Sequence, residues 1–542
     1  MARLYCEQSM QKFTLRGRKR ISFGNAALLL VGTAMVAQLL GFFRTKLINA
    51  NFGGAPQHSP ENFGVYFAAF ALPDFFFFTI AAGALGVAFM PYLTDRLTKG
   101  DRKGVWELSS SLINFLSIFL FAVGIFMFVF ADVLARKIAH GFTPEQLHNV
   151  AAMIRILSLN PMLFTISGII AAVQQVFGRF FFYAIAPLFY NLSIIASIYI
   201  FKHNLGIVGL AYGAAFGALL QLVVIAVGSY GLGFHWRPKI HFTNDFRTML
   251  RQLPPRSLDQ GLDQVQNIVE TNLASSARLG GAAAVGNYNS AYVLHMAPIL
   301  LIGTAISTAV FPRLNARLSQ GRPDLFRQDF LRTLRLIIWI TMPVVVVSFF
   351  ARGYLARLIF SRNSQEIGII FGALCVAILF RTIFALVSRW FYAQKDTRTP
   401  LFVSIFVIAL NVFLAYSLSR PDSYGVAGLA IAQSVVATVE VLMLGSIMLM
   451  RDHKLFDGEF WGGIMRIVSV TGFSLVAGFI AVQFWPLMTA DMGTTLVLKL
   501  SAIAGVTIVT HVVVSGLFGL SEAQQLFGWI KRIILKPVKI EY

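Results

Sequence analysis

The segment PPRSLDQGLDQVQNIVETNL, residues 254–273, carries an unusual number of groups that can do chemistry. If it forms a helix, at about 100° per residue, its apolar side chains fill one face. Six polar side chains then share the opposite arc: Arg256, Asp259, Gln260, Asp263, Asn267 and Glu270. A guanidinium can hold an anion, and a carboxylate can hold a cation or a proton. The polar face is therefore a candidate binding surface.

The rest of the chain is strongly apolar, which makes these polar groups costly. Its 542 residues are 57% hydrophobic and 13% charged, and the mean hydropathy is +0.70. A charge at the centre of a bilayer costs about 2.5–3.5 kcal/mol on insertion scales, so the polar face must line water, a substrate or a partner helix. Arg256 and Asp259 could instead lie at the cytoplasmic interface, and Asp263 could pair with Arg256. Glu270 lies deepest, and we expect it to face a cavity.

Other charged residues interrupt apolar spans and are candidates for the same cavity: Arg44, Asp74, Arg155 and Arg381. A planar guanidinium donates two hydrogen bonds at once, so several arginines would suit an anionic headgroup or would balance buried carboxylates. The alternative is that a long side chain reaches the membrane interface, which is the interpretation we prefer for Lys46, Arg136 and Arg389.

Sequence patterns typical of enzymes and metal sites do not occur in the chain. It contains no GxxxxGK[ST], GxSxG or HExxH. Its nine histidines and two cysteines form no grouping at zinc spacing. The sequence therefore predicts no enzyme, no cofactor and no metal site.

The elements that must position these side chains are long apolar helices. About fourteen stretches are long enough to cross a bilayer. Their continuous apolar runs exclude the alternating pattern of a membrane barrel. We therefore predict an all-α polytopic membrane protein with about 14 transmembrane helices.

A repeat divides most of these helices into two sets of six. The motif PxLxxRLxxG occurs at 91–100 and again at 312–321, and a weaker pair of motifs relates 187–211 to 400–430. Parallel repeats of this kind are typical of transporters, although the motif could also be a common helix-end pattern. We predict two pseudo-symmetric six-helix lobes, followed by two added helices, over the ranges 24–231, 244–450 and 459–520.

Positive charge is distributed unevenly along the chain. The net charge is +21, and the breaks that would share the side of the N-terminus carry about three times as many lysines and arginines as the breaks on the other side. This is the positive-inside pattern of membrane proteins, so we do not predict binding to nucleic acid. We predict cytoplasmic termini, with a basic segment at 1–23 and an amphipathic tail on the membrane surface at 521–542. A disordered tail is the alternative.

Several motifs match one family in order and spacing. They are LGFFR ending at Arg44, LPD ending at Asp74, RILSLNP at 155–161, APLFYN at 186–191, LPPR ending at Arg256 and FYAQKDTRTP at 391–400. With the span count, they make the chain resemble the MviN/MurJ lipid II flippases of the multidrug/oligosaccharidyl-lipid/polysaccharide exporter superfamily, over about residues 22–520. The resemblance implies an alternating-access cavity that carries an undecaprenyl-diphosphate-linked peptidoglycan precursor outward.

The chain departs from the family pattern of arginines around that cavity. Arg44 matches one of them, whereas others correspond here to Gln38, Phe77 and Val293. The phenylalanine run 75–78 also replaces polar residues. We therefore expect substrate handling in the N-lobe to differ from that of other members.

Some family members also bind Na⁺ in the C-lobe. The resemblance places one ligand at Glu270 and a second at Asn411, whereas Ala415 stands in place of a further carboxylate. Asp263 or Glu440 could compensate for that loss.

We expect a monomeric transporter in the bacterial plasma (inner) membrane that flips lipid II, with membrane lipids around it. The expected contacts to the anionic substrate are Arg44, Asp74, Arg155, Arg256 and Arg381, and the expected Na⁺ or H⁺ coupling residues are Glu270, Asp263 and Asn411. The alternatives are an exporter of another polyprenyl-linked glycan or a small cationic drug, and a non-transporting scaffold for cell-wall assembly.

Overall fold

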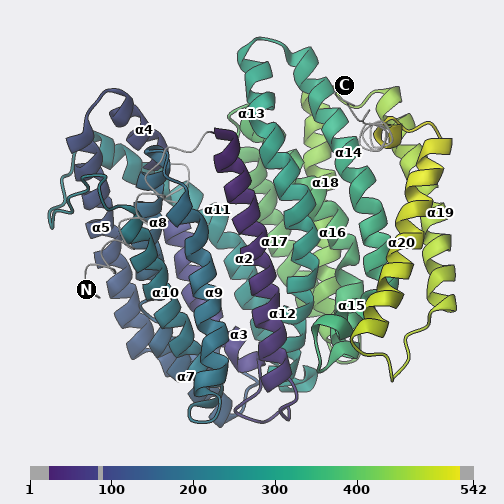
Figure 1. The fold of residues 1–542 in the computed structure, drawn as a ribbon, viewed down its shortest axis with the longest axis horizontal. Helices are drawn as coiled ribbons and strands as arrows, with labels where there is room; N and C mark the ends of the chain where they lie inside the picture. The colour runs from purple at the N-terminus through teal and green to yellow at the C-terminus, as the bar shows by residue number, and fades with distance from the viewer. Residues whose placement is uncertain (1–22, 83–88, 525–542) are drawn as a thin grey trace, which may run out of the picture. The chain divides into compact units, whose positions relative to one another are not determined.

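The computed structural model describes residues 23–82 and 89–524, with side chains described outside 23–31, 81–82 and 252–260. Within these ranges the chain is helical and contains no strand, which confirms the all-α prediction (Figure 1). The predicted segments 1–23 and 521–542 lie almost wholly outside the described residues.

Eleven helical segments in the described ranges are long and apolar enough to cross a membrane. Three other elements lie where further spans are predicted. They are α2 (Phe23–Phe52), α3 (Gly64–Phe76) with the π-helical turn η1 (Phe77–Ala82), and α11 (Asn244–Ala274). The apolar helical stretch at Gly64–Ile80 is short, and α11 is too polar to count among the eleven. The predicted number of 14 therefore stays a prediction, whereas the polytopic helical class is confirmed.

The chain divides into two compact units, Met1–Gly286 and Asn287–Tyr542. The first unit contains, besides α2, α3, η1 and α11, the elements α4 (Met90–Thr98), α5 (Arg102–Val129), α6 (Ala131–Ile138), α7 (Pro144–Leu157), α8 (Asn160–Val176), α9 (Phe181–Phe201), η3 (Gly206–Val208), α10 (Gly209–Gly228) and η4 (Ala277–Leu279). The helix α12 (Gly281–Pro298) begins in this unit and ends in the second.

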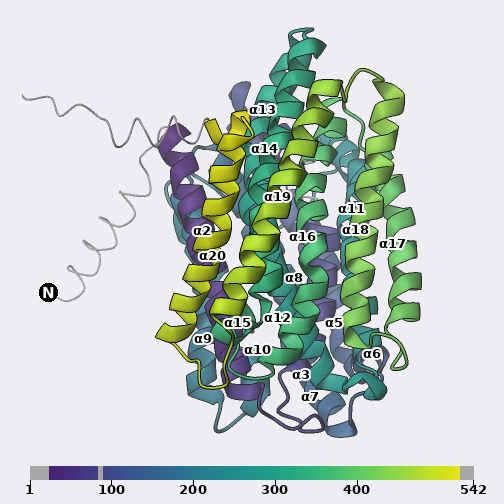
Figure 2. The ribbon, with the colours of Figure 1, turned by 90° about the vertical axis from the view of Figure 1, so that its right-hand side faces the viewer.

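The second unit continues with the π-helical turn η5 and eight helices. They are η5 (Ile299–Thr304), α13 (Ala305–Ser319), α14 (Pro323–Phe350), α15 (Arg352–Ile359), α16 (Ser364–Ala393), α17 (Arg398–Leu418), α18 (Val426–Arg451), α19 (Gly458–Phe484) and α20 (Thr494–Leu517). The helices α16, α17 and α18 pack together, and α19 and α20 pack on α14 (Figure 2).

The position of α11 sets the division between the units. Its residues pack on α3, η1 and α6, and Gly261 lies directly against Thr79 of η1. Along the sequence, the boundary between the compact units therefore falls after residue 286, whereas the boundary between the predicted lobes falls between 231 and 244. The lobe boundaries derived from the repeat remain a prediction about sequence symmetry.

The repeated motif PxLxxRLxxG forms the same structure in both units. It lies on α4 and α13, and the glycine after each helix, Gly100 or Gly321, has a left-handed φ of 76° or 68°. Such a glycine ends a helix without the steric cost that a Cβ would bring. The repeated arginines also form ion pairs, Arg96 with Asp245 at 2.7 Å and Arg317 with Asp329 at 3.1 Å.

Candidate functional site

A polar cluster around Arg44 lies inside the first unit. The guanidinium Nη1 of Arg44 on α2 donates a hydrogen bond of 3.0 Å to Oδ1 of Asn191 on α9. Arg44 also interacts electrostatically with Asp74, Tyr66 and Tyr190. Its Nε is buried without a hydrogen-bond partner. The structure thus brings together two of the predicted substrate residues, Arg44 and Asp74, and leaves one guanidinium donor unused.

Aromatic rings border the Arg44 cluster. Phe77, where the resemblance places a lost arginine, packs on Phe164 with ring centroids 5.3 Å apart. Phe164 in turn contacts Tyr190 edge-to-face at 5.1 Å. The first unit therefore offers one cation beside apolar rings, a combination that suits a ligand with an anionic group next to apolar or sugar surface.

Glu270 on α11 is buried, with 2% of its surface exposed. Its Oε1 accepts a hydrogen bond of 3.0 Å from Nε2 of Gln266, one turn earlier. Asp263 lies two turns from Glu270 and is exposed, so the two predicted coupling carboxylates have different surroundings. Arg256 lies on the same helix, but its side chain belongs to the part that is not described.

Arg155 has a carboxylate partner within the first unit. Its Nη2 lies 2.5 Å from Oδ2 of Asp132 on α6, and both side chains are partly exposed. This pair occupies the C-terminal end of α7, where the span breaks at Ser158 before α8 begins. Arg155 as a substrate contact remains a prediction.

A second buried polar cluster lies in the second unit. Nη1 of Arg381 on α16 donates to Oε2 of Glu440 on α18 at 3.0 Å, and Nη2 reaches Oε1 of Gln433 at 3.4 Å. Ser404 of α17 donates to Oε1 of Glu440 at 3.1 Å. Asn411, also on α17, is fully buried, and neither atom of its amide has a hydrogen-bond partner.

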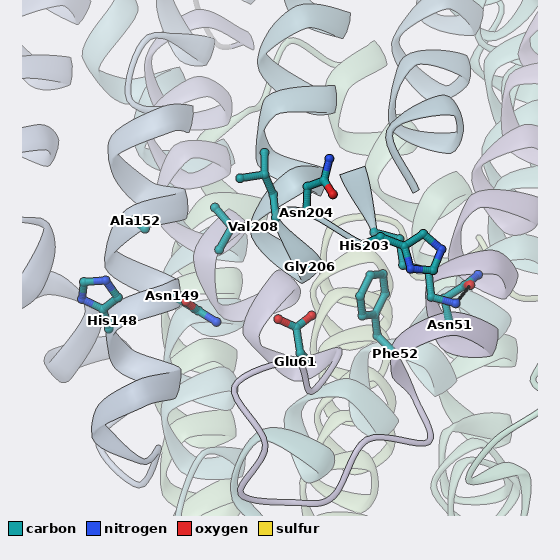
Figure 3. Close-up of a pocket in the computed structure, with 12 residues that line it drawn as sticks. Asn51, Phe52, Glu61, His148, Asn149, Ala152, His203, Asn204, Gly206 and Val208 are labelled. Carbon is teal, nitrogen blue, oxygen red and sulfur yellow. Dashed lines mark hydrogen bonds between the residues drawn. The ribbon is translucent and has the colours of Figure 1, made fainter. Parts of the chain in front are cut away.

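An open pocket of about 680 Å³ lies at one end of the first unit. Figure 3 shows Asn51, Glu61, Asn149 and His203 around it, from the end of α2, the following loop, α7 and the segment after α9. The carboxylate of Glu61 accepts the backbone N–H of Ile207 at 2.8 Å. The pocket therefore presents amides and imidazoles, groups that bind polar ligands by hydrogen bonds.

Sequence reasoning missed several members of these clusters. Three of them are buried amides that each contact a charged residue: Asn191 on α9, Gln266 on α11 and Gln433 on α18. Their signal in the sequence is a polar side chain inside a long helix whose neighbours are apolar. The pocket around Glu61 has no such signal, because its residues come from separate loops and helix ends.

The eleven membrane-length helical segments found in the described residues, with charged clusters inside each unit, are typical of a polytopic membrane transporter. The chain matches the family described as "Lipid II flippase MurJ" over residues 62–503. It therefore belongs to the MurJ lipid II flippase family.

Curated relatives and a solved structure agree with this membership. The "Probable lipid II flippase MurJ" of Rhizobium meliloti is 26% identical over 512 residues, covering 91% of this chain and 93% of that protein. The protein of the same description from Borreliella burgdorferi is 22% identical over 437 residues, covering 79% and 84%. The structure "Lipid II flippase MurJ, inward closed conformation" has the same fold, with a TM-score of 0.73, 19% identity and coverage of 91% and 98%.

Proposed function

We propose that this protein flips an undecaprenyl-diphosphate-linked peptidoglycan precursor, lipid II, from the inner to the outer leaflet by alternating access. Family membership supports the substrate class, and the Arg44 cluster is the observation that carries the proposal in this chain. A guanidinium inside the first unit, with one buried donor unused, suits a diphosphate. In this proposal the protein is a monomeric transporter, not an enzyme, with both termini in the cytoplasm.

The proposed roles of the remaining residues follow their surroundings. Asp74 holds Arg44 in place by charge, and Arg155 and Arg256 contribute positive charge along the first unit. Transport is coupled to a Na⁺ or H⁺ gradient at Glu270, because its carboxylate is buried within the first unit and can bind a proton or a cation. Asp263 and Asn411 are further coupling candidates.

A second candidate substrate is another polyprenyl-linked glycan. The replacement of a family arginine by Phe77, packed on Phe164, favours a headgroup with less charge or more apolar surface. Competition between lipid II and such a glycan for the purified protein would separate the two candidates.

Complementation of a bacterial strain depleted of its own lipid II flippase tests the proposal. We expect this chain to restore growth and normal cell shape. Failure of the well-expressed wild-type protein to do so would remove lipid II as the substrate.

Coupling at Glu270 has its own test in the same strain. Glu270→Gln keeps the size of the side chain and removes its charge, so we expect it to reduce complementation strongly. The matched control is Arg136→Gln, an exposed charge on α6, which should act like the wild type. Equal growth of the two variants would remove the coupling role.

A further inference from the structure

The buried carboxylate of Glu440, in the second unit, is paired with a basic side chain of the same chain. Glu440 is 2% exposed and lies near the middle of α18, a helix long and apolar enough to cross a membrane. A carboxylate in such surroundings must be protonated, bound to a cation or paired with a basic side chain. The guanidinium of Arg381, 3.0 Å away, meets that requirement from within the chain.

Oxygen atoms from two helices, α17 and α18, lie around the Arg381–Glu440 ion pair. Ser404 of α17 holds the second oxygen of Glu440 at 3.1 Å, and Gln433 of α18 accepts from the other end of Arg381 at 3.4 Å. The carboxylate, the hydroxyl and the amide oxygen are the kinds of oxygen that bind hard cations in proteins. Arg381 therefore occupies a place that has the chemistry of a monovalent cation site.

Helix geometry places Asn411 at the level of Gln433, which accepts a hydrogen bond from one end of the Arg381 guanidinium. Ser404 and Asn411 are seven residues apart on α17, and Gln433 and Glu440 are seven residues apart on α18, which is two turns in both cases. The two helices form an antiparallel hairpin in which Ser404 contacts Glu440, so Asn411 lies level with Gln433 on the same face. The buried amide of Asn411, which has no hydrogen-bond partner, therefore lies at the level of the residue that holds the far end of the guanidinium.

We propose that Arg381 is a built-in cation, which occupies a carboxylate site of the second unit that would otherwise take Na⁺ or a proton from solution. The second unit of this protein then needs no ion at Glu440, and any ion coupling takes place elsewhere. Removing the guanidinium while keeping the carboxylate should open the site and make the protein dependent on an external cation.

The groups that face Glu440 come from the helices packed around it. Arg381 belongs to α16 and Ser404 to α17. The buried His295 of α12 interacts electrostatically with Arg381. Protonation of Glu440 itself is therefore the expected response to acid once Arg381 is gone, because the carboxylate has then lost the guanidinium that neutralises it.

Thermal melting of the purified full-length protein tests the proposal. It is followed by tryptophan fluorescence in NaCl or choline chloride of equal ionic strength, at neutral and mildly acidic pH. The variants are Arg381→Gln, Glu440→Gln and the double variant. The control is Arg313→Gln, an exposed arginine whose partner Asp329 keeps a second ion pair with Arg317.

We expect Na⁺ to change the melting temperature of the wild type no more than it changes that of Glu440→Gln. Arg381→Gln should melt about 5 °C lower or more in choline at neutral pH, because the buried carboxylate loses its partner. Na⁺ or acid should restore much of that loss. The double variant should recover the wild-type melting temperature without Na⁺ or acid. Arg313→Gln should melt at the same temperature as the wild type.

Three results would overturn the proposal. The first is a rise in the melting temperature of the wild type with Na⁺ that Glu440→Gln abolishes. The second is an Arg381→Gln protein that melts at the same temperature as the wild type in choline. The third is a lower melting temperature of Arg381→Gln that the double variant does not raise. A Na⁺ response that persists in Glu440→Gln arises at another carboxylate and agrees with the proposal. If Arg381→Gln does not fold, the comparison of wild type with Glu440→Gln in Na⁺ and choline still decides it. Since melting needs no lipid substrate, this outcome is independent of the proposed flippase activity.

Discussion

Arg44 illustrates how a charged residue is kept within an apolar helix. The amide of Asn191 accepts one of its hydrogen bonds, and Asp74 and two tyrosines share its electrostatic surroundings. Because Nε remains buried without a partner, the arginine is held in position but retains a donor for a ligand. The cluster thus has the features of a binding site rather than of a closed structural ion pair.

Arg44→Gln should weaken lipid II binding about tenfold, because a hydrogen bond to a charged group contributes about 1.5–3 kcal/mol. Binding of lipid II to the purified variant measures this. Asn191→Ala should weaken binding less, because it removes only the support of the guanidinium. Unchanged affinity in Arg44→Gln would exclude the cluster as the diphosphate site.

Asp396, in the connection between α16 and α17, makes a pH-dependent contribution to stability. Partial burial alone would raise the pKa of this carboxyl. Hydrogen bonds from the side chain and backbone of Thr399 and the ion pair with Arg451 outweigh burial and lower the pKa to about 2. A lowered pKa in the folded state stabilises the protein above the unfolded pKa of about 3.9.

Asp396→Asn should therefore destabilise the protein at neutral pH by about 2.5 kcal/mol, because folding lowers this pKa from 3.8 to about 2 and one pKa unit corresponds to about 1.4 kcal/mol. The difference from the wild type should shrink as the pH falls from about 4 towards 2. Melting curves across this range measure it. A difference that stays constant with pH would show that the carboxylate charge is not responsible.

At the scale of elements, the hairpin of α17 and α18 depends on one close approach. A Cβ on Gly428 would overlap the backbone carbonyl of Leu418, so only glycine fits there. This approach allows the polar residues of the two helices to meet in one layer, with Ser404 against Glu440. Helix packing, and not the charged residues alone, thus creates the second cluster.

Gly428→Ala should lower the stability of the protein by about 1–3 kcal/mol, because backbone must move to admit the methyl group. Gly445, on the same helix, has open space around its Cα, and Gly445→Ala should be neutral or slightly stabilising. Thermal melting of both variants makes the comparison. Equal melting temperatures would contradict the close packing of the hairpin.

A second feature of the elements is a π-helical turn that directly follows a helix, α3 before η1 and α12 before η5. The turns η1 and η5 occupy 77–82 and 299–304, close to the offset of the sequence repeat. π-helical turns often mark functional bends, so these two are the natural places for each unit to flex. The sequence shows the repeat itself, but a π-turn depends on local hydrogen bonding that no residue pattern specifies.

The sequence predicted the elements better than it predicted the contacts between them. Apolar periodicity is local, so the helices could be inferred from it, whereas the burial of Glu270 on the polar face of its helix could not. The partners of Arg155 and Arg381 could not, because Asp132 and Glu440 lie 23 and 59 residues away along the chain. The packing of α11 on α3 and η1 depends on long-range contacts as well, whereas the repeat suggested only its place in the sequence.

At the scale of the whole molecule, the two units have different charge arrangements. The first has an arginine with an unused donor next to aromatic rings, and the second has an arginine that is paired with a carboxylate. In the proposed function the first unit therefore binds the anionic substrate, and in the further proposal the second unit holds a fixed internal charge. A transporter built in this way would distinguish its substrate mainly through the first unit.

The most direct measurement is transbilayer movement of lipid II in vesicles that contain only the purified protein. We predict that the wild-type protein exposes lipid II on the opposite leaflet, and that Arg44→Gln slows this movement about tenfold. Arg136→Gln should leave it unchanged. Movement of lipid II by the wild-type protein no faster than in protein-free vesicles would contradict the proposed flippase activity.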